Sequence, residues 1–283
     1  MTERTHDKVR ELVRENYGQV AKSGGAGCGC APACCSPDNP APAEDASLAL
    51  GYSREDVTSV PEGANMGLGC GNPQAIASLL PGETVLDLGS GGGFDCLLAA
   101  RTVGPQGHVI GVDMTPEMVA KARRNAEKAG LRHAEFRLGE IEHLPVADCT
   151  IDVIMSNCVI NLSPEKEQVY REAWRVLRPG GRLAISDIVA TLELPDEVKN
   201  DPTLYAGCMA GASVIDEIES VFARIGFQAI RITPKDGSQA LIREWTPDRN
   251  IADFLVSATI EAVKPSAGPT VNGSTIRRPD PVA

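Results

Sequence analysis

Three of the nine cysteines occupy short loops rich in small residues, where a backbone can approach a ligand closely. Cys70 lies in GLGCGNP, Cys158 in SNCVINL and Cys208 in YAGCMAGA. For any one of them alone, a buried packing role is the plainer interpretation. Zinc is a second interpretation, but zinc sites usually contain close ligand pairs such as Cys-x-x-Cys, and the chain has only four histidines. Three separated thiols instead suit a soft, trigonal-pyramidal acceptor, provided that the fold brings them together.

A glycine-rich turn in VLDLGSGGGFD, residues 85–95, joins a predicted buried strand to a predicted helix. Glycines there let the backbone approach a ligand beyond the carboxyl ends of the strands, although the same turn occurs in dehydrogenases and in simple tight connections. The next predicted strand ends in VIGVDM, where a carboxylate can accept hydrogen bonds from both hydroxyls of a ribose. The predicted cofactor-binding residues are Asp87, Gly89, Ser90, Gly91, Asp113, Met114, Glu140, Ile141, Glu142 and Asn157. For the three residues at 140–142, plain solvent exposure is an equally open interpretation.

Short apolar runs alternate with helical patterns from ETVLDLGS, at residue 83, to RLAISDIVA, which ends at residue 190. The alternation predicts an α/β fold with a doubly wound, mainly parallel sheet covered by helices on both faces. Cys158 follows the fourth predicted parallel strand, so we expect it at the same sheet edge as the glycine turn. After about Thr191 the pattern changes, and this part is expected to supply the last strands and a cap. Cys96, in an apolar helix, and Cys149, in a turn, are expected to take no part in the chemistry.

The composition excludes several classes of partner. The formal net charge of −11, with no dense basic run, disfavours a nucleic-acid partner. The first 21 residues have the pattern of a charged amphipathic helix, and no apolar window has the length of a membrane span, so we expect a cytoplasmic protein without a membrane partner. An odd number of unevenly spaced cysteines argues against a framework of structural disulfides. We expect a monomer.

Two sets of motifs resemble a known family. LDLGSGGG resembles the first motif of class I S-adenosylmethionine-dependent methyltransferases, in which the acidic residue, Asp87 here, lies near the methionine amino group. SVPEGANMGLGCGNP, VLDLGSGGGFDC, SNCVINLSP, SDIVATLELP and GCMAGA are similar to arsenite methyltransferases, over roughly residues 47–262. The resemblance implies a Rossmann-like class I methyltransferase fold with S-adenosyl-L-methionine as cofactor. It also implies that Cys70, Cys158 and Cys208 are the thiolates that bind trivalent arsenic.

The expected reaction gives mono- and dimethylated arsenicals for detoxification, with a third methylation left open. Arsenite would arrive as a thiol conjugate, and thioredoxin or glutathione would serve as the reducing co-substrate. The expected parts are an N-terminal helix and flexible Cys-rich segment (1–46), a cofactor-binding methyltransferase domain (47–190), an arsenic-binding cap (191–263) and a disordered tail (264–283). Two alternatives stay open: a methyltransferase acting on a small organic acceptor such as a quinone or sterol, and a non-catalytic, thiol-rich metalloid-binding protein.

The resemblance is incomplete near the N-terminus. Many family members have a further N-terminal cysteine that forms a disulfide with the cysteine at the Cys70 position. The candidates in this chain are Cys28, Cys30, Cys34 and Cys35, in the segment CGCAPACC. They could capture As(III) for delivery to the site or simply bind soft metals on a flexible segment, and the sequence does not choose between these roles.

Overall fold

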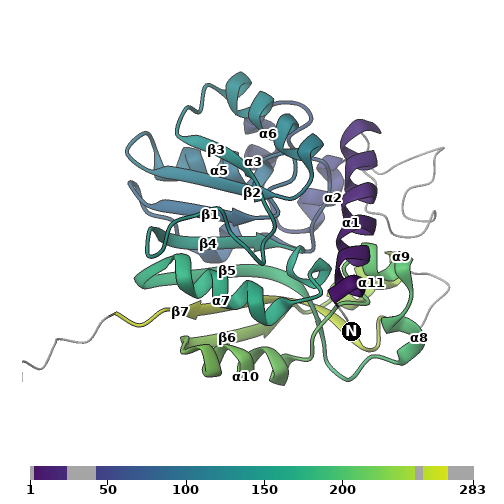
Figure 1. Cartoon of the computed structure of the whole chain (residues 1–283). Helices are drawn as coiled ribbons and strands as arrows, with labels where there is room; N and C mark the ends of the chain where they lie inside the picture. Colours follow the sequence, from purple (N-terminus) through teal and green to yellow (C-terminus); the bar gives the residue numbers. More distant parts are fainter. Residues whose placement is uncertain (1–2, 24–42, 246–250, 267–283) are drawn as a thin grey trace, which may run out of the picture.

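A seven-stranded sheet forms the centre of the molecule in a computed structural model that describes residues 3–23, 43–245 and 251–266 (Figure 1). The strands are β1 Thr84–Leu88, β2 His108–Asp113, β3 Ala134–Leu138, β4 Ile151–Asn157, β5 Leu177–Ala190, β6 Gln228–Pro234 and β7 Leu255–Val263. Their order is β3-β2-β1-β4-β5-β7-β6, in which β1 to β5 are parallel and β7 runs antiparallel to both neighbours. The predicted doubly wound, mainly parallel sheet is therefore confirmed.

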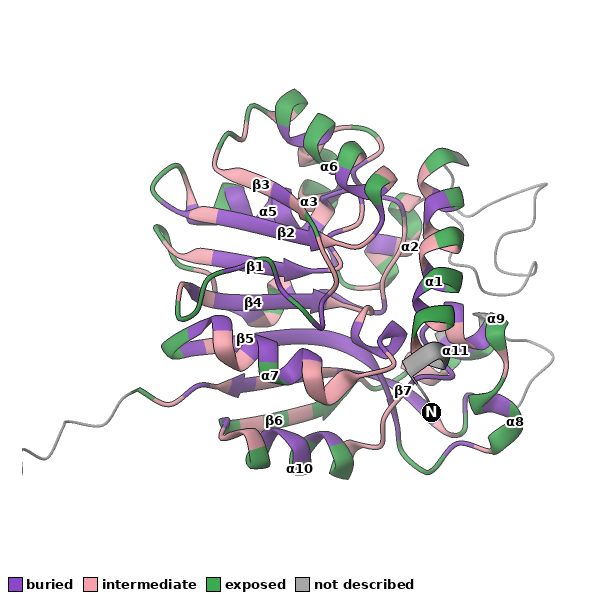
Figure 2. Ribbon diagram, in the orientation of Figure 1, coloured by how far each residue is buried: buried purple, intermediate pink, exposed green. Residues whose placement is uncertain are grey.

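Helices cover both faces of the sheet, as the near-continuous apolar strands require. They are α1 Glu3–Ser23, α2 Ala43–Ala49, α3 Arg54–Ser59, α4 Gln74–Ala77, α5 Phe94–Val103, α6 Pro116–Ala129, α7 Lys166–Val176, α8 Asp196–Lys199, α9 Pro202–Ala206, α10 Ile215–Ile225 and α11 Ser238–Trp245, with a 3₁₀ turn η1 at Ile160–Leu162. Figure 2 shows that the central strands are largely buried, whereas the edge strand β6 and one side of most of the helices include exposed residues. None of the described helices combines the length and the apolar character needed to cross a bilayer.

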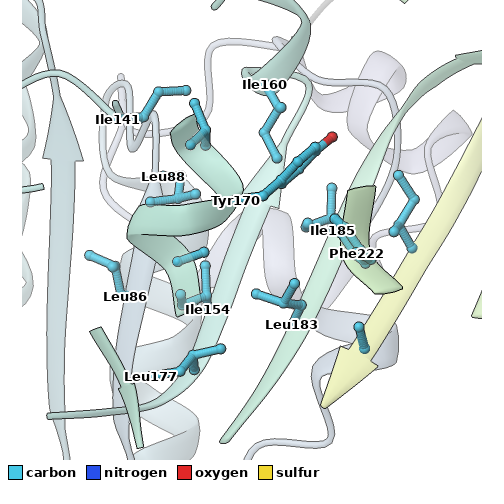
Figure 3. Packing of buried hydrophobic residues seen from close by; sticks show 14 of the residues in the cluster. Leu86, Leu88, Ile141, Ile154, Ile160, Tyr170, Leu177, Leu183, Ile185 and Phe222 are labelled. Atoms are coloured by element: carbon cyan, nitrogen blue, oxygen red, sulfur yellow. The ribbon is translucent and has the colours of Figure 1, made fainter. Parts of the chain in front are cut away.

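Alternate residues of each central strand enter two separate cores, because successive side chains of a strand point to opposite faces. Leu86 and Leu88 of β1 pack with Tyr170 of α7 and Phe222 of α10 in one core (Figure 3). Val85 of β1 packs on the other face with side chains of α5 and α6. This two-sided burial fixes the strand register, and therefore which residues stand at the carboxyl ends.

The sheet reverses its strand order at β1, which lies between β2 and β4. In open α/β sheets, ligands bind at such a switch point, outside the carboxyl ends of the strands. The glycine turn follows β1 and Cys158 follows β4, so both stand at this edge, as expected. Helix α1 runs across the same edge in Figure 1.

The C-terminal part joins the main sheet. Strands β6 and β7 extend it beyond β5, with α10 packed against the same core as α7. Residues 238–245, within the part expected to supply the last strands and a cap, form helix α11. The four N-terminal cysteines lie outside the described residues, as do residues 246–250 and the tail from residue 267.

Candidate active site

A cavity of about 520 Å³ lies at the switch point of the sheet. Its wall contains the three cysteines in question, Cys70, Cys158 and Cys208, together with Asp87, Gly89, Ser90, Gly91, Asp113, Met114, Ile141, Glu142 and Asn157. Of the predicted cofactor-binding residues, Glu140 alone lies outside this wall, and its carboxylate pairs with Arg14 at 3.0 Å. One cavity thus joins the predicted cofactor residues to the predicted thiols.

The glycine loop is held in place by the next strand. Gly89 has a φ of +68°, and a Cβ there would come within 2.5 Å of a Val159 methyl, so only glycine fits. Asp113 accepts hydrogen bonds from the backbone N–H of Gly91 at 2.9 Å and of Thr115 at 2.8 Å. The carboxylate therefore fixes the loop, and it still has lone pairs with which to accept ligand hydroxyls.

Three carboxylates face the cofactor side of the cavity: Asp87 and Asp95, which are buried, and Asp113, which is half-buried. Burial raises the pKa of Asp87, and the neighbouring Asp95 raises it further. Burial likewise raises the pKa of Asp95 to about 6 and raises that of Asp113. Ser90 adds a buried hydroxyl without a hydrogen-bond partner among the described residues. Such a pocket fits a ligand that carries positive charge and hydrogen-bonding groups, and the sulfonium and ammonium of S-adenosylmethionine meet that description.

One residue of this acidic pocket, Asp95, and one contact to it, from Cys96, were missed from the sequence. Asp95, directly after the glycine turn, accepts a hydrogen bond from the Tyr52 hydroxyl at 2.8 Å. Cys96, assigned to packing alone, is fully buried as expected, but its thiol also donates to Asp87 at 3.2 Å. The position of Asp95 in the first turn of α5 was the available signal, since that turn faces the ligand in this type of site.

Asn157 ties the Cys70 loop to the end of β4. Its side-chain oxygen accepts from the Cys70 N–H at 3.0 Å, and its amide donates to the Gly71 carbonyl at 2.9 Å. The same amide lies 3.0 Å from the Tyr52 hydroxyl and 3.3 Å from an Asp95 oxygen. The predicted cofactor residue Asn157 therefore also connects the thiol loop to the acidic pocket.

The fold brings the three predicted thiols together. Cys70 and Cys158 form a disulfide, with their Cα atoms 5.5 Å apart. The Cys208 thiol, which is buried and outside any disulfide, donates to the Cys158 carbonyl at 2.6 Å. Cys158 and Cys208 have φ values of +59° and +63°, a left-handed conformation that is uncommon for residues other than glycine. Backbone strain of this kind clusters at functional sites.

Helix α1 closes the cavity from outside the sheet. Arg10 and Tyr17 belong to the cavity wall, and Val13 packs against Cys208. The Arg10 guanidinium contacts the buried carboxylate of Glu142 at 3.3 Å, and it also pairs with Glu165. The helix thus connects the cofactor loop after β3 with the segment that carries Cys208.

Asp187 lies behind the cysteine pair and was not singled out from the sequence. One of its carboxylate oxygens and the Sγ atoms of Cys70 and Cys158 all lie within 4.8 Å of one another. Burial raises the pKa of Asp187 to about 7. Nothing in SDIVA distinguishes this aspartate from one that caps a turn.

Known proteins share both the sequence and this architecture. A methyltransferase domain model matches residues 79–236. An arsenite methyltransferase of Halobacterium salinarum is 53% identical over 94% of this chain, which spans 69% of that protein. The chain belongs to the arsenite methyltransferase family. A second such protein, from Aquipseudomonas alcaligenes, is 40% identical over 79% of this chain, which spans 63% of its length.

A solved relative extends the comparison to three dimensions. The crystal structure of an arsenic(III) S-adenosylmethionine methyltransferase from Chlamydomonas reinhardtii superimposes with a TM-score of 0.58 at 33% identity, covering 81% of this chain and 75% of that one. The resemblance to arsenite methyltransferases and the predicted class I methyltransferase fold are therefore confirmed. This member of the arsenite methyltransferase family has an acidic pocket and three neighbouring cysteines in the wall of one cavity.

Proposed function

We propose that this protein transfers methyl groups from S-adenosylmethionine to trivalent arsenic held by the thiolates of Cys70, Cys158 and Cys208. One observation carries the proposal: the three cysteines share a cavity with a pocket of buried carboxylates. An organic acceptor such as a quinone would need an apolar pocket and no thiols. The arsenite methyltransferase relatives support the same choice.

The acidic pocket would hold the methyl donor, which supplies an activated methyl group. Asp87 and Asp95 would face its ammonium and sulfonium groups, because opposite charges relieve the cost of burying these carboxylates. Asp113 would accept hydrogen bonds from the ribose, and Ile141 and Glu142 would lie along the adenine. The protein's own contribution is chiefly positioning, which can be worth about 7–11 kcal/mol.

Arsenic would enter as a thiol conjugate, such as one with glutathione, and exchange onto the protein cysteines. Each thiol loses its proton as arsenic binds, so binding should weaken in acid. The disulfide between Cys70 and Cys158 cannot supply two thiolates, so it would first have to be reduced. We assign that reduction to thioredoxin or glutathione, which would also reduce arsenic after each methyl transfer.

The products would be mono- and dimethylated arsenicals, consistent with a role in arsenic detoxification. A monomethylated arsenic has two remaining positions for protein thiols, so its methylation would need Cys158 and Cys208 but not Cys70. The N-terminal cysteines at 28, 30, 34 and 35 would act as auxiliary thiols that pass arsenic or electrons to Cys70. We further propose that the protein works as a cytoplasmic monomer.

The test is to incubate the purified protein with arsenite, S-adenosylmethionine and a thiol reductant, and to resolve methylated arsenic by chromatography with elemental mass detection. Methylated products are expected from the wild type, and none from Cys158→Ser or Cys208→Ser, with cofactor binding retained in calorimetry. Cys149→Ser is the matched control because that thiol is exposed. Arsenite binding without any turnover would instead indicate a metalloid-binding protein.

A further inference from the structure

Asp187 is a buried carboxylate beside the cysteine pair that neither the cofactor site nor the thiol set explains. Its side chain lies near the carboxyl end of β5 in a residue that is 3% exposed. Cys70 and Cys158 both line the cavity, whereas Asp187 does not. Since its carboxylate is within 4.8 Å of both sulfurs, it stands behind them as seen from the cavity.

The surroundings of Asp187 hold the carboxylate in one orientation. Its Oδ1 accepts from the Asn161 side-chain amide at 2.9 Å and from the Ile188 N–H at 2.8 Å. Burial raises the pKa of this carboxylate to about 7, and the ammonium of Lys166, anchored on the Gly211 carbonyl, opposes that rise by attracting the ionised form. In its ionised form, a carboxylate shielded from water acts strongly on any charge that develops nearby.

We propose that Asp187 stabilises the positive charge that arsenic acquires as the methyl group is transferred. This inference rests on the proposed function. In the transfer, the arsenic lone pair forms the As–C bond while the C–S⁺ bond breaks and its electron pair stays on sulfur. Arsenic is formally oxidised from As(III) to As(V), the methyl carbon takes the two electrons, and no proton moves. A neutral arsenic tris-thiolate becomes a cation beside the carboxylate.

The position of Asp187 makes its effect selective for the transition state. The bound arsenic thiolate is neutral, so the carboxylate adds little to arsenic affinity. The charge grows only as the methyl group approaches from the cavity, on the side away from Asp187. An interaction that strengthens in the transition state raises kcat rather than lowering KM.

A purely structural role is the competing interpretation. The backbone N–H groups of Ile160 and Asn161 also stabilise the carboxylate, so Asp187 helps to hold the turn after Cys158. Two comparisons separate charge from shape at this position. The first compares the wild type with Asp187→Asn, and the second compares Asp187→Glu with Asp187→Gln. The two members of each pair have nearly the same shape and differ in charge. The second pair decides if Asp187→Asn does not fold.

The experiment measures single-turnover methyl transfer on protein preloaded with arsenite under reducing conditions. The expected result is a rate about 100-fold lower for the amide member of a pair. The affinity for arsenite, measured by elemental analysis, and the affinity for S-adenosylmethionine, measured by calorimetry, should each agree within about threefold between the two members of a pair. Asp152→Asn is the control, because its carboxylate pairs with Arg178 at the amino end of β4. It should retain the wild-type rate.

Three outcomes are distinct. Equal rates within a pair, or a loss explained entirely by weaker arsenic binding, would overturn the inference while leaving the proposed function standing. A slower amide member with unchanged affinities would support it. If the wild type itself forms no methylated arsenic, the proposed function fails, and the inference fails with it.

Discussion

Asn157 is the residue whose loss should uncouple Cys70 from the rest of the site. Asn157→Ala removes the four hydrogen bonds from its side chain to Cys70, Gly71, Tyr52 and Asp95. At about 0.5–1.5 kcal/mol each, the net loss is about 2–6 kcal/mol. About half of it falls on the Cys70 loop, because two of the four bonds are to the Cys70 N–H and the Gly71 carbonyl.

The variant should therefore affect the two methylation steps differently. If about 2 kcal/mol is lost from the Cys70 loop, binding of arsenite through three thiols should weaken about 30-fold. Methylation of a monomethylated arsenic, which we assign to Cys158 and Cys208, should change much less. The melting temperature should fall by about 6–12 °C for a loss of 3 kcal/mol in a protein of this size.

The assay follows both methylated products over time at saturating S-adenosylmethionine, with cofactor affinity measured separately because Asn157 also lines the cavity. Asn72→Ala is the matched control. Asn72 is buried nearby, and its side chain donates to the Gly51 carbonyl at 3.0 Å and accepts from the Ala75 N–H at 3.3 Å, so neither bond goes to the Cys70 backbone. Its variant should lose stability and keep the ratio of the two steps. Equal slowing of both steps in Asn157→Ala, at unchanged cofactor affinity, would refute the reasoning.

Three further predictions concern the cofactor pocket. The pKa of Asp95, near 6, exceeds its value in the unfolded chain, so the protein without cofactor should lose stability as pH rises from about 4 to 6. The affinity for S-adenosylmethionine should instead rise through the same window, by up to tenfold per pH unit, because the cationic cofactor prefers the ionised carboxylate. Melting and calorimetry against pH measure the two effects, and a flat affinity profile would count against Asp95. Tyr52→Phe removes a hydrogen bond that lowers the pKa of Asp95, so the curve of cofactor affinity against pH should move to higher pH and keep its shape. Arg10→Met leaves Glu142 buried beside a neutral side chain, so it should weaken cofactor binding about tenfold and speed amide exchange in α1. Arg14→Met, at a half-exposed arginine that pairs with the partly exposed Glu140, should do neither, and equal exchange in both variants would contradict the prediction.

The sequence predicted the parts of this molecule that depend on local pattern. The strands and helices of the sheet follow from the alternation of apolar runs, and Gly89 and Asp113 follow from their places after two adjacent strands. The convergence of Cys70, Cys158 and Cys208 required a resemblance, because thiols separated by 50 or more residues have no local signal.

Contacts between distant segments could not be predicted. Arg10 lies 132 residues from Glu142, and its approach depends on how α1 packs across the sheet edge. Asp187 gave no signal either, because an aspartate near the end of a strand more often caps a turn. The resemblance to relatives left open whether an N-terminal cysteine pairs with Cys70, and those cysteines lie outside the described residues. It gave no indication of the pairing that the structure has, between Cys70 and Cys158.

The distribution of carboxylates around the cavity suggests why the two halves of the site should work in sequence. Asp87, Asp95 and Asp113 surround the place where the proposed reaction begins with a sulfonium, and Asp187 stands where it ends with a cationic arsenic. Transfer would move one positive charge from the first group to the second. The spent cofactor would then have lost its sulfonium charge and would keep only its ammonium as a positive group, so the three carboxylates would bind it less tightly. The arsenic cation would stay beside Asp187 until thiols reduce it. Cofactor release before arsenic release is the order that these charges favour.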